Sequence, residues 1–310
     1  MRIAVLDLGT NTFHLLIVAV TRNGMIRKVF KSKVVVKLGE GAIHKNEIAP
    51  LPFQRGIKAL RHYKKIIGQH KPEKVFAFAT SAIRSAINGK DFTAAAIKET
   101  GLHISVIPGT KEAELIYYGV RQCVEISDKP SLIMDIGGGS TEFIIANNKK
   151  IYWKHSYNIG AARLLELFKP SDPVTLGEVH SLQQFLSGEL KDLFEAVRKY
   201  QPTELIGSSG SFDTFADMIG RRFHGRNITG STTHYRFKME EYAELHQILL
   251  KSTTRQRMKM PGLIKMRVDM IVLASICTTF VLEKCNLKEM TLSKYALKEG
   301  ALWAIINDKI

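Results

Sequence analysis

One pattern occurs twice in this sequence: an apolar run, an aspartate at its end, and then a glycine turn rich in hydroxyl or amide side chains. The first copy is DLGTNT at residues 7–12, and the second is DIGGGSTE at residues 135–142. Apolar runs at residues 3–6 and 132–134 precede the two copies, as expected for buried strands that end in a turn. Strands and helices alternate after each copy, so the repeat has the scale of a domain. The pattern predicts an α/β chain made of two related domains.

The length of 310 residues fits two domains of roughly 150 residues, each with its own core. The SDKP segment near residues 124–130 interrupts the alternation of strands and helices, which marks the predicted boundary. We therefore assign residues 1–126 to the first domain and 127–297 to the second, and we expect a C-terminal helix at 298–310 to pack back on the first domain. An Asn-Gly pair at residues 23–24 predicts the turn that follows the opening hairpin.

The composition excludes several classes of protein. Hydrophobic residues make up 45% of the chain, which is typical of a folded globular protein rather than a disordered one. Asp7 and Asn11 interrupt the N-terminal apolar run, so we expect a folded first strand there rather than a signal peptide. The apolar stretch 270–282 is too short to span a bilayer. The three cysteines are too widely spaced for a disulfide framework or for CxxC metal pairs, so we expect small buried residues. We expect a cytoplasmic protein with no membrane partner.

The net charge of +16 is concentrated in the first half of the chain. Residues 1–124 contain 20 Lys and Arg but only eight Asp and Glu. Lys31, Lys33 and Lys37 share parity, so a strand would place all three on one face. Residues 48–72 form an acid-free interval, and basic residues occur there at helical spacing. These residues are Arg55, Lys58, Arg61 and Lys65.

The basic stripes have two interpretations. One is a solvated surface without a ligand, and the other is a face that binds a polyanion, which would relieve the repulsion between like charges. Nucleic acid is disfavoured as that polyanion, because few aromatic residues are interleaved with the basic ones and no recognition motif is present. Inorganic polyphosphate or a polyphosphorylated nucleotide satisfies the same electrostatics.

The two glycine turns predict a phosphate-binding site. Backbone N–H groups in such a turn converge into an anion-binding nest, and the missing Cβ atoms let a phosphate approach closely. The expected phosphate-binding residues are Gly9, Thr10 and Asn11 in the first turn and Gly137, Gly138, Gly139, Ser140 and Thr141 in the second. Asp7 and Asp135 would repel bound phosphates unless Mg²⁺ lies between them. The alternative is a pair of tight hairpins with capping aspartates; the sequence contains neither a P-loop motif nor GxGxxG.

Two residues between the turns suggest phosphoryl-transfer chemistry. Arg84 follows a predicted buried strand, where a guanidinium can make bidentate contacts with phosphate oxygens. Glu112 stands at the start of a predicted helix after a Pro-Gly turn, where it can orient and deprotonate a water molecule. Each has a simpler alternative: Arg84 as a surface residue of a helix, and Glu112 as an acid that complements the helix dipole.

Taken together, the ordered motifs resemble the exopolyphosphatase/guanosine pentaphosphate phosphohydrolase (Ppx/GppA) family, within the actin/hexokinase/heat-shock ATPase superfamily. The resemblance begins with DLGTNTFHLLI, LGEG, ATSAIRSAIN and PGTKEAELIYYGV in the first half of the chain. It continues with DIGGGSTEF, NIGAARL, IGSSGSFDTFA, RVDMI and LKEGAL in the second half. Each motif alone is weak, but the ordered set is specific and spans essentially the whole chain.

The resemblance implies two actin-like (ribonuclease H-like) domains with an interdomain active-site cleft. It also implies Mg²⁺-dependent hydrolysis of the terminal phosphate of inorganic polyphosphate or of guanosine pentaphosphate, by a homodimer. In family terms, Glu112 activates the attacking water, Arg84 clamps phosphate, and Glu142 belongs to both the catalytic and the metal site. The implied metal ligands are Asp7, Asp135 and Glu142, and Ser209 and Gly210 are implied in phosphate binding.

The chain departs from the family pattern in three respects. Lys111 stands where an acid commonly precedes the catalytic glutamate, and it adds positive charge near the phosphate path. Thr10 and Thr12 replace frequent serines but keep the hydroxyl groups. Larger members add C-terminal helical domains with a His-Asp signature; no histidine here is followed by aspartate, so we expect the short, two-domain form.

Two other functions remain possible from the sequence. A sugar or acetate kinase, or an ATPase, of the same superfamily would also have two phosphate turns. The GSSG segment at 207–210 occupies the place of the nucleotide-binding turn of the kinases, whereas Glu112 with the accompanying motifs favours water as the acceptor. The second is a non-catalytic sensor of polyphosphate or of an alarmone, which would bind its ligand without turnover.

Overall fold

The computed structural model describes residues 1–21 and 25–310, so the turn predicted at residues 23–24 lies outside the described part of the chain. The described chain divides into two compact units. The first unit comprises Met1–Glu112 and Ala304–Ile310, and the second comprises Ala113–Trp303.

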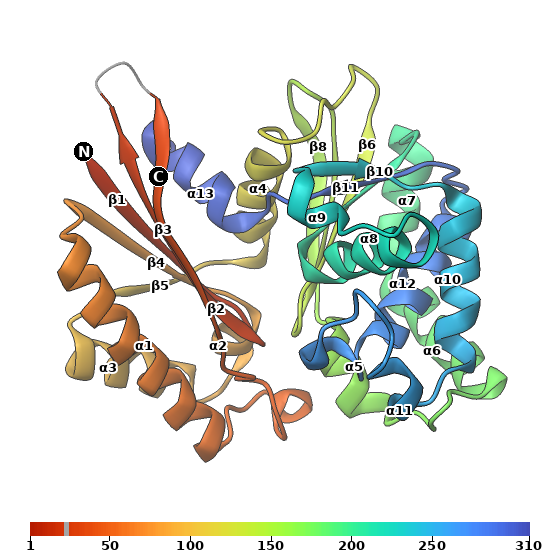
Figure 1. Ribbon diagram of the computed structural model, residues 1–310, viewed down its shortest axis with the longest axis horizontal. Helices are drawn as coiled ribbons and strands as arrows, with labels where there is room; N and C mark the ends of the chain where they lie inside the picture. Colours follow the sequence, from red (N-terminus) through yellow and green to blue (C-terminus); the bar gives the residue numbers. More distant parts are fainter. Residues whose placement is uncertain (22–24) are drawn as a thin grey trace. The chain divides into compact units, whose positions relative to one another are not determined.

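Both divisions between the units lie inside helices. One falls within α4 (Gly109–Val120) and the other within α13 (Leu297–Ile306). The sequence pattern predicted boundaries near residues 126 and 297 instead. Each unit contains one mixed sheet with helices against it, which confirms the α/β class (Figure 1).

The first unit is built on a five-stranded sheet with strand order β3-β2-β1-β4-β5. Its strands are β1 (Arg2–Leu8), β2 (Thr12–Val20), β3 (Ile26–Val35), β4 (Lys74–Ala79) and β5 (Ile104–Val106). Its helices are α1 (Pro50–His70), α2 (Ser81–Ser85), α3 (Gly89–Thr100) and the first turn of α4, with a 3-10 turn at Ile43–Lys45.

The second unit is built on a six-stranded sheet with strand order β10-β11-β9-β6-β7-β8. Its strands are β6 (Ser131–Ile136), β7 (Thr141–Ala146), β8 (Ile151–Tyr157), β9 (Leu205–Ser208), β10 (His234–Arg236) and β11 (Met290–Ser293). Its helices include α5 (Ala161–Phe168), α6 (Leu176–Glu189), α7 (Lys191–Tyr200), α8 (Ser209–Phe223), α9 (Ile228–Ser231), α10 (Met239–Lys251), α11 (Thr254–Arg257) and α12 (Ile271–Lys284), with a 3-10 turn at Lys265–Arg267. No helix of the described chain has both the length and the apolar character needed to cross a membrane.

The two sheets have the same topology, which confirms the duplication predicted from the glycine turns. In the first sheet, β1, β2 and β3 form an antiparallel meander, and β4 and β5 continue parallel to β1. In the second sheet, β6, β7 and β8 form the same meander, and β9 and β11 continue parallel to β6. The short strand β10 is an addition at the edge of the second sheet. Each motif DLGTNT and DIGGGSTE therefore occupies the first hairpin of its own sheet.

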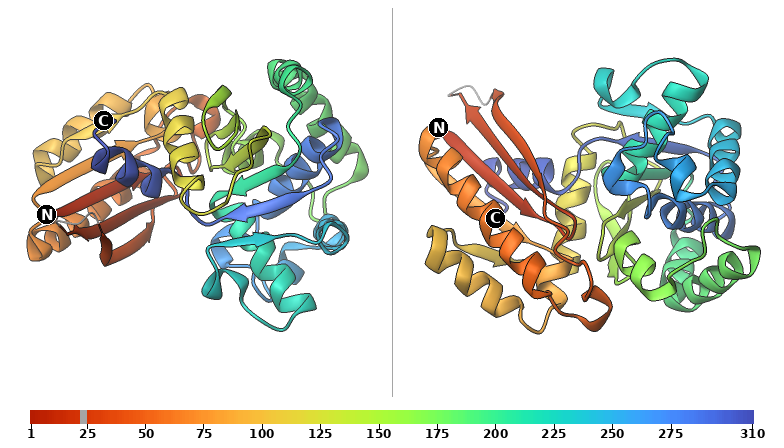
Figure 2. Two further views of the ribbon diagram at one scale, coloured as in Figure 1. Left: turned by 90° about the horizontal axis from the view of Figure 1, so that it is seen from above. Right: turned by 60° about the horizontal axis from the view of Figure 1, so that its bottom comes forward.

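Residues of β1 and β2 alternate between the two faces of the first sheet. Leu6, Leu8 and Phe13 belong to the face that packs against α1 and α3, where Leu60, Tyr63 and Phe92 complete the core. Figure 2 shows α1 and α3 side by side against this sheet. Because side chains alternate along a strand, Asp7 and His14 belong to the opposite face.

Helices α4 and α13 cross in close contact through two glycines of the second unit. A Cβ atom on Gly300 would overlap the carbonyl oxygen of Leu115, and one on Gly119 would overlap that of Ala296. Glycine at both positions lets the two backbones touch. The LKEGAL motif thus has a packing role at this crossing.

Candidate active site

Asp7 and Asp135 occupy equivalent places in the two sheets. Each is the last residue but one of the first strand of its sheet, and a glycine turn follows each strand. The parallel strands of each sheet end at the same edge. In open α/β sheets, ligands bind outside this carboxyl edge. The predicted phosphate and metal residues of each motif are thus at the ligand-binding edge of their own sheet.

The DIGGGSTE turn is held through its carbonyl groups by the start of α5. The carbonyls of Gly137 and Gly138 accept hydrogen bonds from the backbone amides of residues 161–163, at 2.9 to 3.0 Å. The Nε atom of Arg163 donates to the carbonyl of Gly139, at 3.1 Å. Because C=O and N–H point in opposite directions across a trans peptide, the amides of residues 138–140 point away from α5. Successive amides oriented this way make a concavity for an anion.

Gly160 and Arg163 are site residues that the sequence reasoning did not single out. The side chain of Arg163 is 93% buried beneath the turn, since only 7% of the residue is exposed. A Cβ atom on Gly160 would lie 2.5 Å from backbone atoms of Gly138 and Gly139, closer than real Cβ contacts. Both residues belong to the NIGAARL motif. Its position directly after a strand is the sequence feature that could have identified them. The motif supports the turn from behind.

The DLGTNT turn is held in the same way by the segment that follows β3. The amides of Val36 and Lys37 donate to the carbonyl of Asn11 at 2.9 and 3.0 Å, and the amide of Leu38 donates to that of Thr10 at 2.6 Å. By the same peptide geometry, the N–H of Asn11 points away from this segment. Gly9 closes the turn, since its amide donates to the carbonyl of Thr12 at 3.1 Å. The LGEG motif thus begins with the residue that fixes the first turn.

Polar residues form one row across the second sheet. Asp135 on β6 is directly opposite Glu142 on β7, and Asp135 is also level with Ser208 on β9. The register continues to both sides of these strands. The complete row is Ser156, Glu142, Asp135, Ser208 and Ser293. Five neighbouring strands therefore contribute one polar residue each at the same level.

Serine hydroxyls hold both carboxylates of this row. Asp135 accepts hydrogen bonds from Ser208 Oγ at 2.5 Å and from Ser209 Oγ at 2.7 and 2.8 Å to its two oxygens. Glu142 accepts from Ser140 Oγ at 2.6 Å and from Ser156 Oγ at 2.7 Å. Burial raises the pKa of Asp135, although the two serines and the charge of Lys298 act in the opposite direction.

Ser209 holds its place by an unusual backbone conformation. Its φ of 68° is in the left-handed region, which few residues other than glycine adopt. This conformation occurs at the junction of β9 and α8 and coincides with hydrogen bonds to both oxygens of Asp135. Ser209 was predicted to bind phosphate, and in this structure its hydroxyl is bound to Asp135.

Gly210 lies against the half-buried guanidinium of Arg267. A Cβ atom on Gly210 would overlap the guanidinium of Arg267, whose Nη1 donates to Thr214 Oγ1 at 2.6 Å. Burial lowers the pKa of Arg267, and the neighbouring carboxylates of Asp213 and Asp217 act in the opposite direction. Arg267 comes from the RVDMI motif, to which the sequence reasoning assigned no role. It supplies positive charge beside the predicted phosphate-binding glycine.

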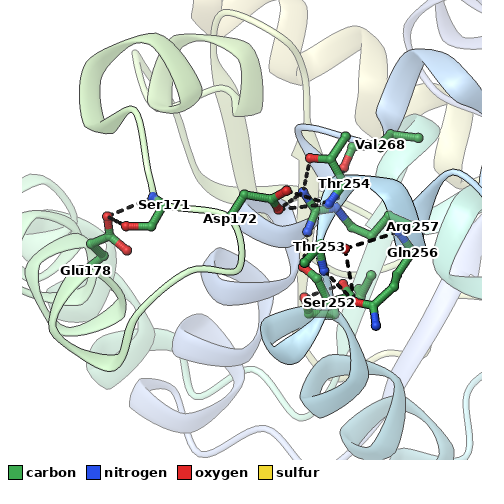
Figure 3. A network of polar contacts seen from close by, with 10 residues as sticks. Ser171, Asp172, Glu178, Ser252, Thr253, Thr254, Gln256, Arg257 and Val268 are labelled. Atoms are coloured by element: carbon green, nitrogen blue, oxygen red, sulfur yellow. Dashed lines mark hydrogen bonds and ion pairs between the residues drawn. The ribbon is translucent and has the colours of Figure 1, made fainter.

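A polar network anchors the segment that precedes RVDMI (Figure 3). Arg257 is 5% exposed, and its Nε donates to the carbonyl of Val268 at 2.8 Å. Its other nitrogens donate to the Ser252 carbonyl, to Thr254 Oγ1 at 2.9 Å and to Asp172 at 3.0 Å. Val268 follows Arg267 directly, so this network fixes the backbone beside Arg267.

Arg84 and Glu112 form an ion pair inside the first unit. Arg84 Nη1 lies 2.6 Å from Glu112 Oε2 and 3.3 Å from the carbonyl oxygen of Ile107. The side chains are 21% and 9% exposed. Arg84 is in α2, which follows β4, and Glu112 is in α4, which follows β5. Because β4 and β5 are neighbouring parallel strands, the helices that follow them begin side by side.

The first sheet has a different residue at the position that corresponds to Glu142. There His14 on β2 is directly opposite Asp7 on β1. The Nε2 atom of His14 is 2.9 Å from Thr12 Oγ1. The two halves of the duplication therefore place an Asp–His pair and an Asp–Glu pair at equivalent positions. Carboxylates are concentrated in the second copy.

The carboxylates suit Mg²⁺, which keeps some of its waters, better than they suit a metal whose ligands all come from the protein. No group of three or more His, Cys, Asp or Glu among the described residues is arranged to hold a metal ion. Mg²⁺ keeps several waters and is commonly bound by one or two carboxylates together with substrate phosphates. The Asp135–Glu142 pair, with its hydroxyl surroundings, fits that donor set.

Comparisons with known proteins agree on one family. The sequence model of the Ppx/GppA phosphatase family matches residues 17–308. A crystal structure of an exopolyphosphatase from Cytophaga hutchinsonii is 37% identical, with a TM-score of 0.96 over 99% of this chain and 98% of that chain. Exopolyphosphatase 1 of Mycobacterium leprae is 26% identical over 97% of this chain and 88% of its own length. The Aquifex aeolicus member of the Ppx/GppA family, 24% identical, shares the fold with a TM-score of 0.81 over 100% of this chain and 98% of that chain.

Proposed function

This chain belongs to the Ppx/GppA phosphatase family, and we propose that it is a Mg²⁺-dependent exopolyphosphatase that releases orthophosphate from the end of inorganic polyphosphate. The names of its relatives support polyphosphate as the substrate class. Guanosine pentaphosphate ends in the same kind of phosphoanhydride bond, so we include it as a second candidate substrate. A cytoplasmic location and a homodimer stay predictions.

The DIGGGSTE motif carries this proposal. Its turn presents the amides of residues 138–140 on the side away from α5, and its acids Asp135 and Glu142 are opposite each other next to that turn. A bare pair of carboxylates would repel a phosphate chain, whereas a pair that shares Mg²⁺ with the phosphates would attract it. Amides for phosphate and carboxylates for a cation at one turn are what hydrolysis of a phosphoanhydride requires.

The residues of the chain have distinct roles in the proposed reaction. Each glycine turn offers backbone amides to phosphate oxygens. Asp135 and Glu142 would hold Mg²⁺ in the second unit, and Asp7 is the proposed metal-binding acid of the first unit. When bound, Mg²⁺ would neutralise charge on the phosphate oxygens. Glu112 orients a water molecule and accepts its proton as the water oxygen attacks the terminal phosphorus. The bridging P–O bond breaks, and the shortened chain leaves with the electron pair.

Arg84 has two partners in this proposal, Glu112 and a phosphate oxygen. In the structure it is bound to Glu112, which keeps the carboxylate oriented. A guanidinium has five N–H donors, so Arg84 can bind a phosphate oxygen while it still contacts Glu112. The positive charge then stabilises the transferring phosphoryl group.

One experiment separates this function from the kinase, ATPase and sensor alternatives. Orthophosphate release is measured from polyphosphate, guanosine pentaphosphate and ATP, with Mg²⁺ and with EDTA. We expect Mg²⁺-dependent release from polyphosphate that exceeds release from ATP. Release from ATP alone would indicate an ATPase, and binding of polyphosphate without any release would indicate a sensor.

A further inference from the structure

Three lysines line one face of the edge strand β3. Lys28, Lys31 and Lys33 are all exposed, and their cross-strand neighbours on β2 are Val18, Leu16 and His14. Residues opposite each other in an antiparallel pair share a face, so the three lysines share the face of these β2 residues. A β-bulge between Val18 and Ile17 changes the phase of β3, and it brings Lys28 onto the face of Lys31 and Lys33.

The predicted alignment of Lys31, Lys33 and Lys37 is wrong for Lys37. That residue lies beyond the end of β3 in a left-handed conformation with a φ of 48°, and its Nζ is 3.7 Å from Glu40. The lysine face of β3 therefore consists of Lys28, Lys31 and Lys33.

The lysine face leads to the first glycine turn. Strand β3 runs antiparallel to β2, so its end at Val35 is level with Thr12, the first residue after the turn. The next residues of the same segment donate their amides to the carbonyls of Thr10 and Asn11. Lys33 is level with Asp7 two strands away, a separation of roughly 10 Å at the usual strand spacing.

The basic residues of α1 are on a helix that packs against the opposite face of the sheet from the lysine face. Arg55 binds Glu40 at 2.5 Å, and Arg61 binds Glu99 at 2.8 Å. These acids come from outside the acid-free interval of the sequence, so part of the α1 stripe is neutralised within the fold. Helix α1 also packs on the other face of the sheet, where Leu60 and Tyr63 meet Leu6 and Phe13. The lysine face, in contrast, is on the face of the sheet that carries Asp7 and His14, and it leads to the first glycine turn.

We propose that the lysine face binds the part of a polyphosphate chain that extends away from the first glycine turn. This inference rests on the proposed function. A polyphosphate whose terminal phosphate is at the turn carries further negative charge at every unit, and a line of exposed cations at the same sheet edge attracts it. The lysine face would then raise the affinity for long chains and affect a short substrate much less.

Lysines on an edge strand also have a simpler role, because they keep the edge from pairing with another chain. The test must therefore measure substrate affinity and association separately. The variant is Lys28→Gln/Lys31→Gln/Lys33→Gln in the full chain. The matched control is Lys58→Gln/Lys64→Gln/Lys65→Gln, three exposed lysines of α1 that remove the same charge.

Initial rates of orthophosphate release are measured with long-chain polyphosphate and with tripolyphosphate, at low and at physiological salt. We expect the lysine-face variant to raise KM for the long chain about tenfold, from three exposed charges each contributing modestly. The KM for tripolyphosphate should rise much less, and the control variant should keep both values. The salt dependence of KM for the long chain should also become shallower in the variant.

Several outcomes would overturn the inference. If the wild type is active but the variant keeps its KM for the long chain, the lysine face does not bind substrate. Aggregation of the variant, seen by light scattering, with unchanged KM would assign the lysines to edge protection. Loss of binding to a fluorescent single-stranded oligonucleotide with unchanged polyphosphate kinetics would assign the face to nucleic acid. Absence of any release by the wild type would instead contradict the proposed function itself.

Discussion

Asp135 and Glu142 are directly opposite each other on neighbouring strands, and both are almost completely buried, at 5% and 1% exposure. Opposite residues of an antiparallel pair have Cβ atoms roughly 5 Å apart, so two like charges here are unfavourable. Four serine hydroxyls surround the pair, from residues 140, 156, 208 and 209. When both carboxylates are ionised, a bound cation would relieve the repulsion between them.

The first prediction concerns Asp135→Asn. Burial raises the pKa of Asp135, so its ionised form at neutral pH costs stability in the folded protein. The serine hydroxyls can rotate to accept from the amide, and removal of the like charge should raise the free energy of unfolding by roughly 0.5–1 kcal/mol in EDTA. Turnover should be lost. Urea unfolding with EDTA and with Mg²⁺ tests this, and Mg²⁺ should stabilise the wild type more than the variant.

Asp269→Asn is the control for that experiment, because Asp269 is exposed. It should change neither stability nor the response to Mg²⁺. A clear loss of stability of Asp135→Asn in EDTA would show that the carboxylate is a structural acceptor for Ser208 and Ser209.

Glu112→Gln tests the proposed general base. The amide keeps the size of the side chain but cannot accept the proton of water, so kcat should fall by about 10²–10⁴-fold while polyphosphate binding persists. Glu114→Gln is the matched control on the same helix, since Glu114 binds Lys154 at 2.7 Å. Steady-state kinetics and a direct binding assay measure both effects. A near-wild-type kcat of Glu112→Gln would contradict the role of general base. Glu112 would then only complement the dipole at the start of α4.

The Arg84–Glu112 ion pair predicts coupled effects on catalysis. Arg84→Ala should raise KM, because a phosphate contact is lost, and should also lower kcat, because Glu112 loses the group that orients it. The double variant Arg84→Ala/Glu112→Gln should be little worse than the more damaged single variant. Strictly additive effects on kcat/KM would mean that the pair acts as two independent residues.

His246 predicts a pH dependence of stability. It is buried between α10 and α12, its Nδ1 lies 3.1 Å from Ser275 Oγ, and burial lowers its pKa from 6.5 to about 4. Between these values the unfolded chain binds a proton that the folded protein does not. The stabilisation is therefore complete above pH 6.5 and is lost as the pH falls toward 4, by on the order of 3 kcal/mol at most.

Urea unfolding between pH 7 and pH 4, with His246→Asn, tests this prediction. The variant should lose part of the slope of unfolding free energy against pH. His180→Asn, at an exposed position of α6, should keep it. If the free energy of unfolding of His246→Asn depends on pH as steeply as that of the wild type, His246 is not the cause of the dependence.

Arg257 predicts a large loss of stability on substitution. Its guanidinium satisfies two backbone carbonyls, Thr254 Oγ1 and Asp172 at once (Figure 3). Arg257→Met leaves these acceptors without donors and should cost about 3–5 kcal/mol. Arg257→Lys should not rescue it, because an ammonium cannot reach all of these positions. Arg255→Lys on the same helix is exposed and should be neutral in thermal unfolding.

Local pattern was sufficient to predict the strands that carry the two motifs, the glycine turns and the duplication. Apolar runs, strand-end aspartates and glycines encode a strand and a turn within about ten residues. The same pattern could not reveal that Ser208 and Ser209 hold Asp135, because those residues are 73 and 74 positions away in sequence. The pattern also did not reveal the roles of Arg163 and Arg267. Their hydrogen-bond acceptors, the Gly139 carbonyl and Thr214 Oγ1, lie on other elements.

The charge pattern also did not reveal contacts between elements that are far apart in sequence. The acid-free interval of α1 suggested a basic face, yet Glu40 and Glu99 reach its arginines from other segments. Parity predicted Lys37 on the face of Lys31 and Lys33, but Lys37 lies beyond the end of β3. It also missed Lys28, which a bulge brings onto that face. Sequence distance between opposite charges is therefore a poor guide to whether they pair.

The sequence by itself determined that this chain forms two related α/β units, each with a glycine turn that follows a strand-end aspartate. Only the tertiary structure decided which residues come together: Glu142 beside Asp135, Arg84 bound to Glu112, and Lys28 on the same face as Lys33. The physical reason is that hydrophobic periodicity and turn chemistry act within one element. Contacts between elements depend on strand order and register, which are set by how the whole sheet packs.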